Sequence, residues 1–307
     1  MQMIDRQIRV SIVICTHNRS TDVVQCLNAL IARTTGLDVE LIVVDSGSNE
    51  EHSRHMQQYL REHSSVKYLR LDVPGTSLAR NAGLRLARGE WIWWLDDDAI
   101  PTADWPERLA DTIRNSDGKT AVIGGKVIPQ FEDGADTEGL TKRWRLLLTC
   151  IDQDKPGYVS EGCNIACANM LMKRSVALEV GGFSEKLGRS ANQFLTGEES
   201  LLIEMIHDRG FKCAYQPMLS VLHKVSSKRL TREWVSERAY WEGHVRFRIL
   251  KLSNRKMPWS LNPLKLLISI YVLQLLSMLK PSDADLAIRM NLAKGTLDAI
   301  GASRASL

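Results

Sequence analysis

The sequence predicts an α/β protein with a mostly parallel sheet flanked by helices, followed by a mainly helical C-terminal extension. Short apolar runs alternate with helical segments over the first hundred residues, the connections between them are short, and the composition changes near Val225. Such alternation implies right-handed crossovers between parallel strands. We therefore expect one domain over 1–224, with halves at 1–100 and 101–224, and an extension over 225–307.

The first half repeats an apolar strand pattern that is followed each time by polar residues. Continuous or alternating apolar runs predict strands at Val10–Cys15, Leu41–Val44, Val66–Leu71 and Trp91–Leu95. Three helices are expected between these strands. The first begins at Ser20 or Thr21, the second ends at about Glu62, and the third runs from about Ser77 to Arg88.

The pattern becomes less regular after Pro101. In chain order we expect a helix to about Asn115, a segment at Gly124 and Gly125, a loop from about Gln130 to Gly139, a strand at Asn164–Met172 and a helix at Glu198–Asp208. This half therefore departs from a simple strand–helix repeat.

Composition excludes several classes of protein. The 307 residues are 44% hydrophobic and 25% charged, which is typical of a globular chain and not of a disordered one. A net charge of +4 is too small to indicate a nucleic-acid partner. The six cysteines include no C-x-x-C pair and are expected to be free thiols, and the short N-terminal apolar run is not typical of a signal peptide. We expect a cytoplasmic protein.

Polar residues follow three of the predicted strands, at Thr16–Arg19, Asp45–Ser48 and Asp96–Asp98. In an open parallel sheet, ligands bind beyond these carboxyl ends. Three adjacent carboxylates repel one another unless a cation compensates them, and carboxylate oxygens suit Mg²⁺ or Mn²⁺ holding a nucleotide diphosphate. A solvated acidic turn is the alternative. Arg80 is a candidate for the phosphates, or else an ordinary surface arginine, because no glycine-rich phosphate loop occurs.

Five stretches together resemble a known family. They are VSIVICTHNRS, LIVVDSGS, PGTSLARNAGLRLARGEWIWWLDDDAIP, EGCNIACANMLMKRSVALEVGGF and LTGEESLLIEMIHDRGFKCAYQPMLSVLHK. In this order they look like the inverting family 2 glycosyltransferases of the GT-A fold, over roughly Arg9 to Lys224. The resemblance implies a Rossmann-like GT-A sheet whose first half binds a nucleotide-sugar and whose second half binds the acceptor.

The resemblance also implies roles for single residues. Asp98 would bind Mn²⁺ or Mg²⁺, and His223 matches a position near the metal or diphosphate, although a strand-end histidine is the alternative. Asp45 would accept from a ring N–H of the base, which favours a UDP- or dTDP-sugar with a guanosine donor as second choice. The nucleotide-sugar-binding set comprises Thr16, Asn18, Arg19, Asp45, Arg80, Asp96 and Asp97.

Glu199 is the candidate general base. The family motif usually reads Gly-Glu-Asp, whereas this chain has Gly197, Glu198 and Glu199. Glu199 would remove the proton of the acceptor hydroxyl in a single inverting displacement, while a metal stabilises the departing diphosphate. The acceptor would be a saccharide or lipid-linked sugar in polysaccharide or glycolipid assembly. Acidic residues favoured at a helix N-terminus are the alternative for Glu199, and an inactive membrane-associated nucleotide-sugar-binding or scaffold protein is the alternative for the whole chain.

The extension is basic and then apolar. Lys224–Lys256 contains ten basic and three acidic residues, and Leu266–Leu279 contains no charge. We expect 225–280 to attach the enzyme peripherally to the cytoplasmic face of a membrane. Docking of the apolar helix on the catalytic domain, or on a second subunit in a homodimer, is the alternative.

Overall fold

The computed structural model describes residues 10–34, 37–153, 155–159, 164–189 and 195–305. The strands among them are β1 (Val10–Thr16), β2 (Val39–Ser46), β3 (Val66–Leu71), β4 (Trp91–Asp96), β5 (Ala99–Pro101), β6 (Thr120–Phe131), β7 (Gly157–Val159), β8 (Asn169–Lys173) and β9 (Lys212–Val225). The helices are α1 (Ser20–Thr34), α2 (Glu50–Glu62), α3 (Thr76–Leu86), α4 (Trp105–Arg114), α5 (Lys142–Leu147), α6 (Arg174–Glu179), α7 (Glu198–Asp208), α8 (Arg232–Leu252), α9 (Pro263–Leu279) and α10 (Ala284–Ala305), with short 3₁₀ turns η1 (Ser227–Leu230) and η2 (Trp259–Leu261).

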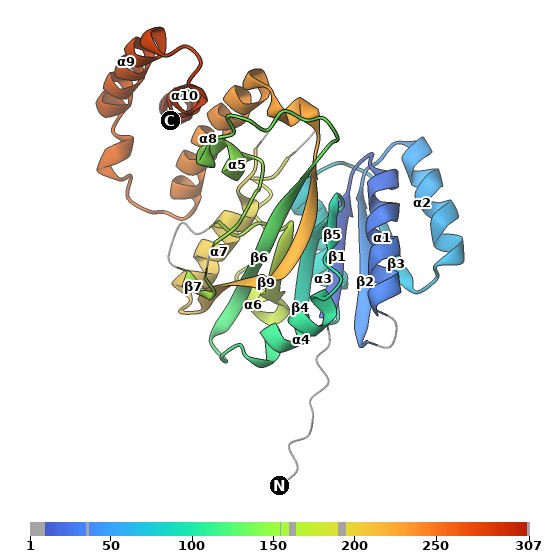
Figure 1. Ribbon diagram of the computed structural model, residues 1–307. Coiled ribbons are helices and arrows are strands. Elements are labelled where there is room, and N and C mark those ends of the chain that lie inside the picture. The colour runs from blue at the N-terminus through green and yellow to red at the C-terminus, as the bar shows by residue number, and fades with distance from the viewer. Residues whose placement is uncertain (1–9, 35–36, 154, 160–163, 190–194, 306–307) are drawn as a thin grey trace.

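One mixed sheet of nine described strands forms the centre of the molecule, in the order β3-β2-β1-β4-β8-β6-β9-β5, with β7 also paired to β9 (Figure 1). Strands β1 to β4 are parallel, as their spacing in the sequence predicts. Strand β8 runs antiparallel between β4 and β6, while β6 and β9 are parallel. The mostly parallel α/β sheet is therefore confirmed.

Helices cover both faces of the sheet because successive strand residues point to opposite sides. On one face Ile12 and Trp93 pack with α1 and α4, for example against Leu27 and Trp105. On the other face Val13 and its neighbours pack with α3, α6 and α7. The continuous apolar runs of the sequence are thus strands buried on both faces.

The second half differs from expectation in its details. Gly124 and Gly125 lie inside the long strand β6, and the strand expected at Asn164–Met172 spans only Asn169–Lys173. The short helices α5 and α6 were not predicted from the sequence because each has only six residues, too few to show a helical period. The five described cysteines are free, and Cys163 lies outside the described residues.

The C-terminal helices form a unit beside the sheet, which Figure 1 shows at the end of the chain. Strand β9 ends at Val225, where the composition changes. Helix α8 packs on α7 through Val245 and Ile249, and α10 packs along α8. None of the described helices is long and apolar enough to cross a membrane.

Candidate active site

The candidate site lies at the carboxyl ends of β1, β2 and β4. The parallel register places Thr16 beside Asp45 and Cys15 beside Asp96, so the polar residues after each strand meet at one edge. A cavity of about 490 Å³ opens there. Its walls include most of the site residues predicted from the sequence, together with Glu198: Thr16, Arg19, Arg80, Asp96, Asp97, Asp98, Glu198, Glu199 and His223.

The three consecutive aspartates have different environments. Asp96 is partly exposed, whereas Asp97 and Asp98 are buried. Arg19 bridges the two buried carboxylates, with Nη1 2.7 Å from Asp97 and 2.8 Å from Asp98, and Thr16 donates to Asp97 at 2.8 Å. Burial raises the pKa of Asp97 to about 7 despite the charge of Arg19. These contacts exclude the solvated acidic turn as a description of this segment.

Two of these aspartates form a candidate metal centre with His223. One ligand atom from each of Asp96, Asp98 and His223 lies within 4.8 Å of the others. Strand β9 brings His223 opposite Ala99 of β5, directly after the aspartates, and His223 Nε2 lies 3.3 Å from Asp98 Oδ1. Burial alone would raise the pKa of Asp98, but the hydrogen bond to His223 and the charge of Arg19 hold it well below its usual range.

This donor set fits a divalent cation. Two carboxylates and one imidazole are suitable ligands for Mn²⁺, and Mg²⁺ is also bound by one or two carboxylates together with substrate phosphates. The buried Nδ1 of His223 has no hydrogen-bond partner among the described residues, whereas Nε2 faces Asp98. The geometry therefore supports the predicted grouping of Asp98 with His223 and adds Asp96 to it.

Arg80 connects the aspartates to α7. Its buried guanidinium pairs with Glu198, lies 3.7 Å from Asp96 Oδ1 and 3.9 Å from Glu199 Oε2, and stands 5.6 Å from the centre of the Phe183 ring. The alternative interpretation of Arg80, as an ordinary surface arginine, is thus excluded. Arg80 contacts Asp96 at the end of β4 and also Glu198 and Glu199 in the first turn of α7. It therefore holds that turn against the end of β4.

Glu199 lies in the first turn of α7, beside the cavity. Its side chain is only 19% exposed, and Oε2 has no hydrogen-bond partner among the described residues. Burial, together with the neighbouring charge of Glu198, raises the pKa of Glu199 to about 7. A carboxyl group with this pKa exchanges a proton near neutral pH, which is the property required of a general base. The preceding Gly197 has φ +90°, and a Cβ there would lie 2.4 Å from Val245.

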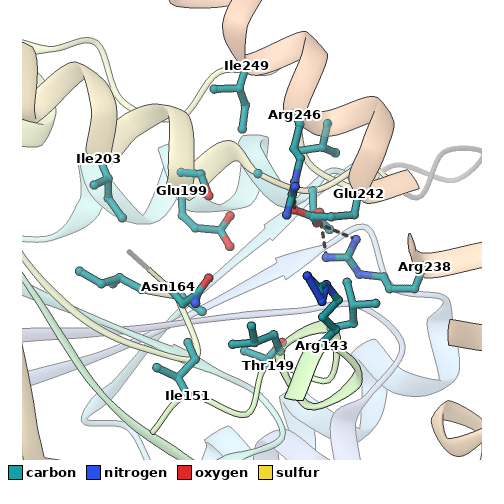
Figure 2. Close-up of a pocket in the computed structure, with 18 of the residues that line it drawn as sticks. Arg143, Thr149, Ile151, Asn164, Glu199, Ile203, Arg238, Glu242, Arg246 and Ile249 are labelled. Carbon is teal, nitrogen blue, oxygen red and sulfur yellow. Dashed lines mark hydrogen bonds and ion pairs between the residues drawn. The ribbon is translucent and has the colours of Figure 1, made fainter. Parts of the chain in front are cut away.

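A second and larger cavity, of about 710 Å³, adjoins the first and shares Glu199 and Arg238 with it. Figure 2 shows Glu199 facing this space, with Arg238, Glu242 and Arg246 opposite it on α8 and Arg143 nearby on α5. The lining combines charged side chains with apolar ones such as Ile203 and Ile249 (Figure 2). Glu199 therefore stands between a cavity lined by both carboxylates and arginines and a second one with mixed polar and apolar walls.

Two predicted residues do not line the cavity, Asp45 and Asn18. Asp45 is fully buried, and its carboxylate accepts from the Tyr68 hydroxyl at 2.7 Å and from the Ser48 N–H at 2.8 Å. Asn18 is exposed, and its Oδ1 accepts from the Asn49 N–H at 2.8 Å. Neither side chain lines the 490 Å³ cavity. In this state both residues therefore organise the loops after β1 and β2.

Three arginines in the first cavity were not expected from the sequence: Arg189, Arg229 and Arg238. Arg229 Nη2 lies 4.0 Å from Asp98 Oδ2, and Arg238 donates to Thr196 at 3.2 Å and pairs with Glu242 at 3.1 Å. Arg229 and Arg238 belong to the basic run at Lys224–Lys256, whose composition indicated a membrane surface. A count of charges does not show which side of a helix faces the cavity.

Comparison with known proteins agrees with this geometry. The chain is 28% identical to a glucosyl-dolichyl phosphate glucuronosyltransferase of Haloferax volcanii over 77% of this chain and 75% of that protein. It is 25% identical to the succinoglycan biosynthesis protein ExoM of Rhizobium meliloti over 84% and 81% of the two chains. The mannosyltransferase PcManGT of Pyrobaculum calidifontis, solved with GDP-Man and Mn²⁺, superposes with a TM-score of 0.59 at 18% identity, over 98% of this chain and 76% of that one.

The fold is that of the GT-A glycosyltransferases, to which the comparison structure belongs. Residues 11–179, more than half of the chain, match the family described as Glycosyl transferase family 2. The chain belongs to this family, and the predicted fold is confirmed.

Proposed function

We propose that this protein is a metal-dependent inverting glycosyltransferase that moves a sugar from a nucleotide-diphosphate sugar to an acceptor hydroxyl. The observation that carries the proposal is the position of Glu199 between two cavities, one lined by the Asp96–Asp98–His223 cluster and one by mixed polar and apolar side chains. A donor diphosphate would occupy the first cavity and the acceptor the second.

In this proposal each of the main cavity side chains has one role. Asp96, Asp98 and His223 would hold Mn²⁺ or Mg²⁺, which when bound neutralises charge on the departing diphosphate. Arg229, 4.0 Å from Asp98, and Arg238 line the same cavity and would contact the phosphates. Glu199 would take the acceptor proton as the hydroxyl oxygen attacks the anomeric carbon. This arrangement would support a single displacement with inversion, in which the acceptor oxygen forms its bond to the anomeric carbon as the bond to the diphosphate breaks.

The base of the donor is proposed to be uracil or thymine. Each oxygen of the Asp45 carboxylate accepts one hydrogen bond and has a second lone pair. Asp45 is fully buried here, so a ring N–H of the base would reach Oδ2 only where the Tyr68 hydroxyl moves away from it. Guanine also carries a ring N–H, so a guanosine donor is the second choice, and the GDP-Man in the comparison structure makes it worth testing.

The names of the relatives suggest the acceptor class. One is a glucosyl-dolichyl phosphate glucuronosyltransferase and another belongs to succinoglycan biosynthesis. We propose that the acceptor here is likewise a lipid-linked or polysaccharide hydroxyl, presented at the cytoplasmic face of a membrane. The apolar Ile203 and Ile249 beside Arg238 in the larger cavity suit a sugar ring with a linked hydrophobic or anionic group.

The test is a screen of nucleotide-sugars for nucleotide release with Mn²⁺ and a lipid-linked glycan acceptor. Release that requires the acceptor, with a product of inverted anomeric configuration by NMR, would support the proposal. An inactive binding protein would bind donor without any release, and a retained anomeric configuration would contradict the single displacement.

A further inference from the structure

Helix α9 has an apolar stripe that the rest of the chain does not cover. Leu264 is 66% exposed, Ile268 55%, Tyr271 63% and Leu275 46%. The remaining exposed apolar residues of the helix continue the stripe at a spacing of three or four residues: Leu267, Val272, Leu276, Met278 and Leu279. A continuous apolar face of this extent on a folded chain indicates a binding surface.

The opposite face of α9 is held by the protein. Leu266 and Leu273 are 6% and 5% exposed, and Leu266 packs into a cluster with Ala293 and Ile300 of α10 and with Phe247 of α8. Figure 1 shows α9 at the outer end of the C-terminal helices. The packing fixes one side of α9 and turns the stripe outward.

The charged residues within 256–280 are all positive. Residues 256–280 contain Lys256, Lys265 and Lys280 and no aspartate or glutamate. All three lysines are exposed, and Lys265 Nζ lies 4.4 Å from the centre of the Trp259 ring, which is itself 70% exposed. Tryptophan, tyrosine and lysine beside an apolar helix face are typical of the boundary between lipid and water.

We infer that α9 lies in the surface of an anionic membrane, with its exposed stripe among the acyl chains and its lysines at the headgroups. Charge complementarity selects lipid over a second copy, because a symmetric pair of α9 helices would bring two sets of lysines together without a compensating acid on either helix. Much of the basic run at Lys224–Lys256 is otherwise engaged, for example Arg229 with Asp98 and Arg255 with Asp208 at 2.9 Å.

The position of α9 at a membrane bears on how the acceptor reaches the enzyme, and this part of the inference rests on the proposed function. Helix α10, which holds α9, also contributes Asp285, Ile288 and Leu292 to the wall of the larger cavity. An acceptor anchored in the membrane would therefore enter a cavity whose wall is one helix away from the lipid. Glu199 lines that cavity.

The test is flotation of the full chain with vesicles of phosphatidylcholine alone or mixed with phosphatidylglycerol, without donor or acceptor. We expect binding to the anionic vesicles that weakens with added salt. Lipids with brominated acyl chains should quench part of the tryptophan fluorescence, and Trp259→Phe should remove that part. The other described tryptophans are buried or half-buried, so the difference reports on Trp259.

Two α9 variants separate the apolar and electrostatic contributions. Combined Ile268→Gln, Tyr271→Gln and Leu275→Gln should abolish binding to both kinds of vesicle, since these side chains are exposed and their loss does not open the core. The matched control is Leu178→Gln with Met218→Gln, exposed apolar residues on other elements, which should bind as the parent does. Replacing the three lysines by glutamine should weaken anionic-vesicle binding by about fivefold per lysine.

Parent protein that stays unbound with anionic vesicles at low salt would overturn the inference. So would an α9 glutamine variant that binds as well as the parent, or a parent dimer that this variant converts to monomer while neither binds vesicles. Binding is measured without turnover, and glycosyl transfer is scored separately by nucleotide release. If vesicle binding fails, the transfer assay still tests the proposed function, and if transfer fails, the binding assay still tests the membrane contact of α9.

Discussion

At the scale of single residues, the site separates cation binding from proton transfer. Asp98 belongs to the cluster with Asp96 and His223, whereas Glu199 lies in the first turn of α7, where Arg80 bridges it to Asp96. Asp98→Ala should therefore lose Mn²⁺-dependent nucleotide binding. Glu199→Gln should keep that binding and lose transfer by about 10²–10⁴-fold, the range for removing a general base.

Isothermal titration with UDP and Mn²⁺, together with turnover assays, checks this pair. Each variant is the control for the other, because each removes one carboxylate from the lining of the same cavity. Transfer at the parent rate by Glu199→Gln would refute its assignment as the base.

The pKa of Glu199 predicts how the rate depends on pH. Burial and Glu198 raise this pKa to about 7, and a general base acts in its deprotonated form. The rate should therefore rise about tenfold per unit below pH 7 and level off above it. Turnover measured across this range at saturating donor checks the prediction, with the residual rate of Glu199→Gln as the control. A profile that levels off near the ordinary pKa of a glutamate would argue against it.

At the scale of elements, the C-terminal helices depend on two glycines. A Cβ on Gly243 of α8 would lie 2.2 Å from Leu292 O, and a Cβ on Gly295 of α10 would lie 1.9 Å from Tyr240 O. Thr296 strengthens this close contact by donating to Gly243 O at 3.1 Å. The backbones of α8 and α10 approach each other here as closely as they do because neither glycine has a side chain.

We expect Gly295→Ala to destabilise the protein by about 1–3 kcal/mol, because overpacking outweighs the gain in helix propensity. Gly301, on the same helix, is exposed, and no atom lies within 4 Å of the position that a Cβ would take there. Gly301→Ala should therefore stabilise by about 0.5–1 kcal/mol. Urea unfolding of both variants measures the two signs, and equal effects would mean that α8 and α10 do not pack this closely.

At the scale of the whole molecule, the site joins residues that are distant in the chain. Asp96 ends β4, His223 lies on β9 and Arg229 lies in η1, so a ligand that contacts all three binds only the folded chain. UDP with Mn²⁺ at about 100 times its dissociation constant should add about 2.7 kcal/mol to the free energy of unfolding.

Thermal unfolding with UDP, GDP or ADP measures this linkage, and EDTA should remove the metal-dependent part. The adenine ring presents only acceptors at N1 and N3, so a carboxylate at Asp45 disfavours it. Stronger stabilisation by ADP than by UDP would contradict the proposed role of Asp45, although not the metal site.

Much of the first half was predictable from sequence because its signals are local. Continuous apolar runs such as Val10–Cys15 belong to strands covered on both faces, and parallel strands deliver their ends to one edge, so Thr16, Asp96 and their neighbours could be grouped in advance. The family motifs added His223 and Glu199 to that group, and the structure places both on the same cavity.

What the sequence by itself determined is therefore the α/β class, the acidic edge and the family. Only the tertiary structure decided that Arg80 pairs with Glu198, that Arg229 and Arg238 face the cavity, that Asp45 does not line it, and that α9 leaves its apolar stripe uncovered. The physical reason is that strand periodicity and turn chemistry act between neighbours in the chain, whereas the direction of a charged or apolar helix face depends on which distant element packs against the other side.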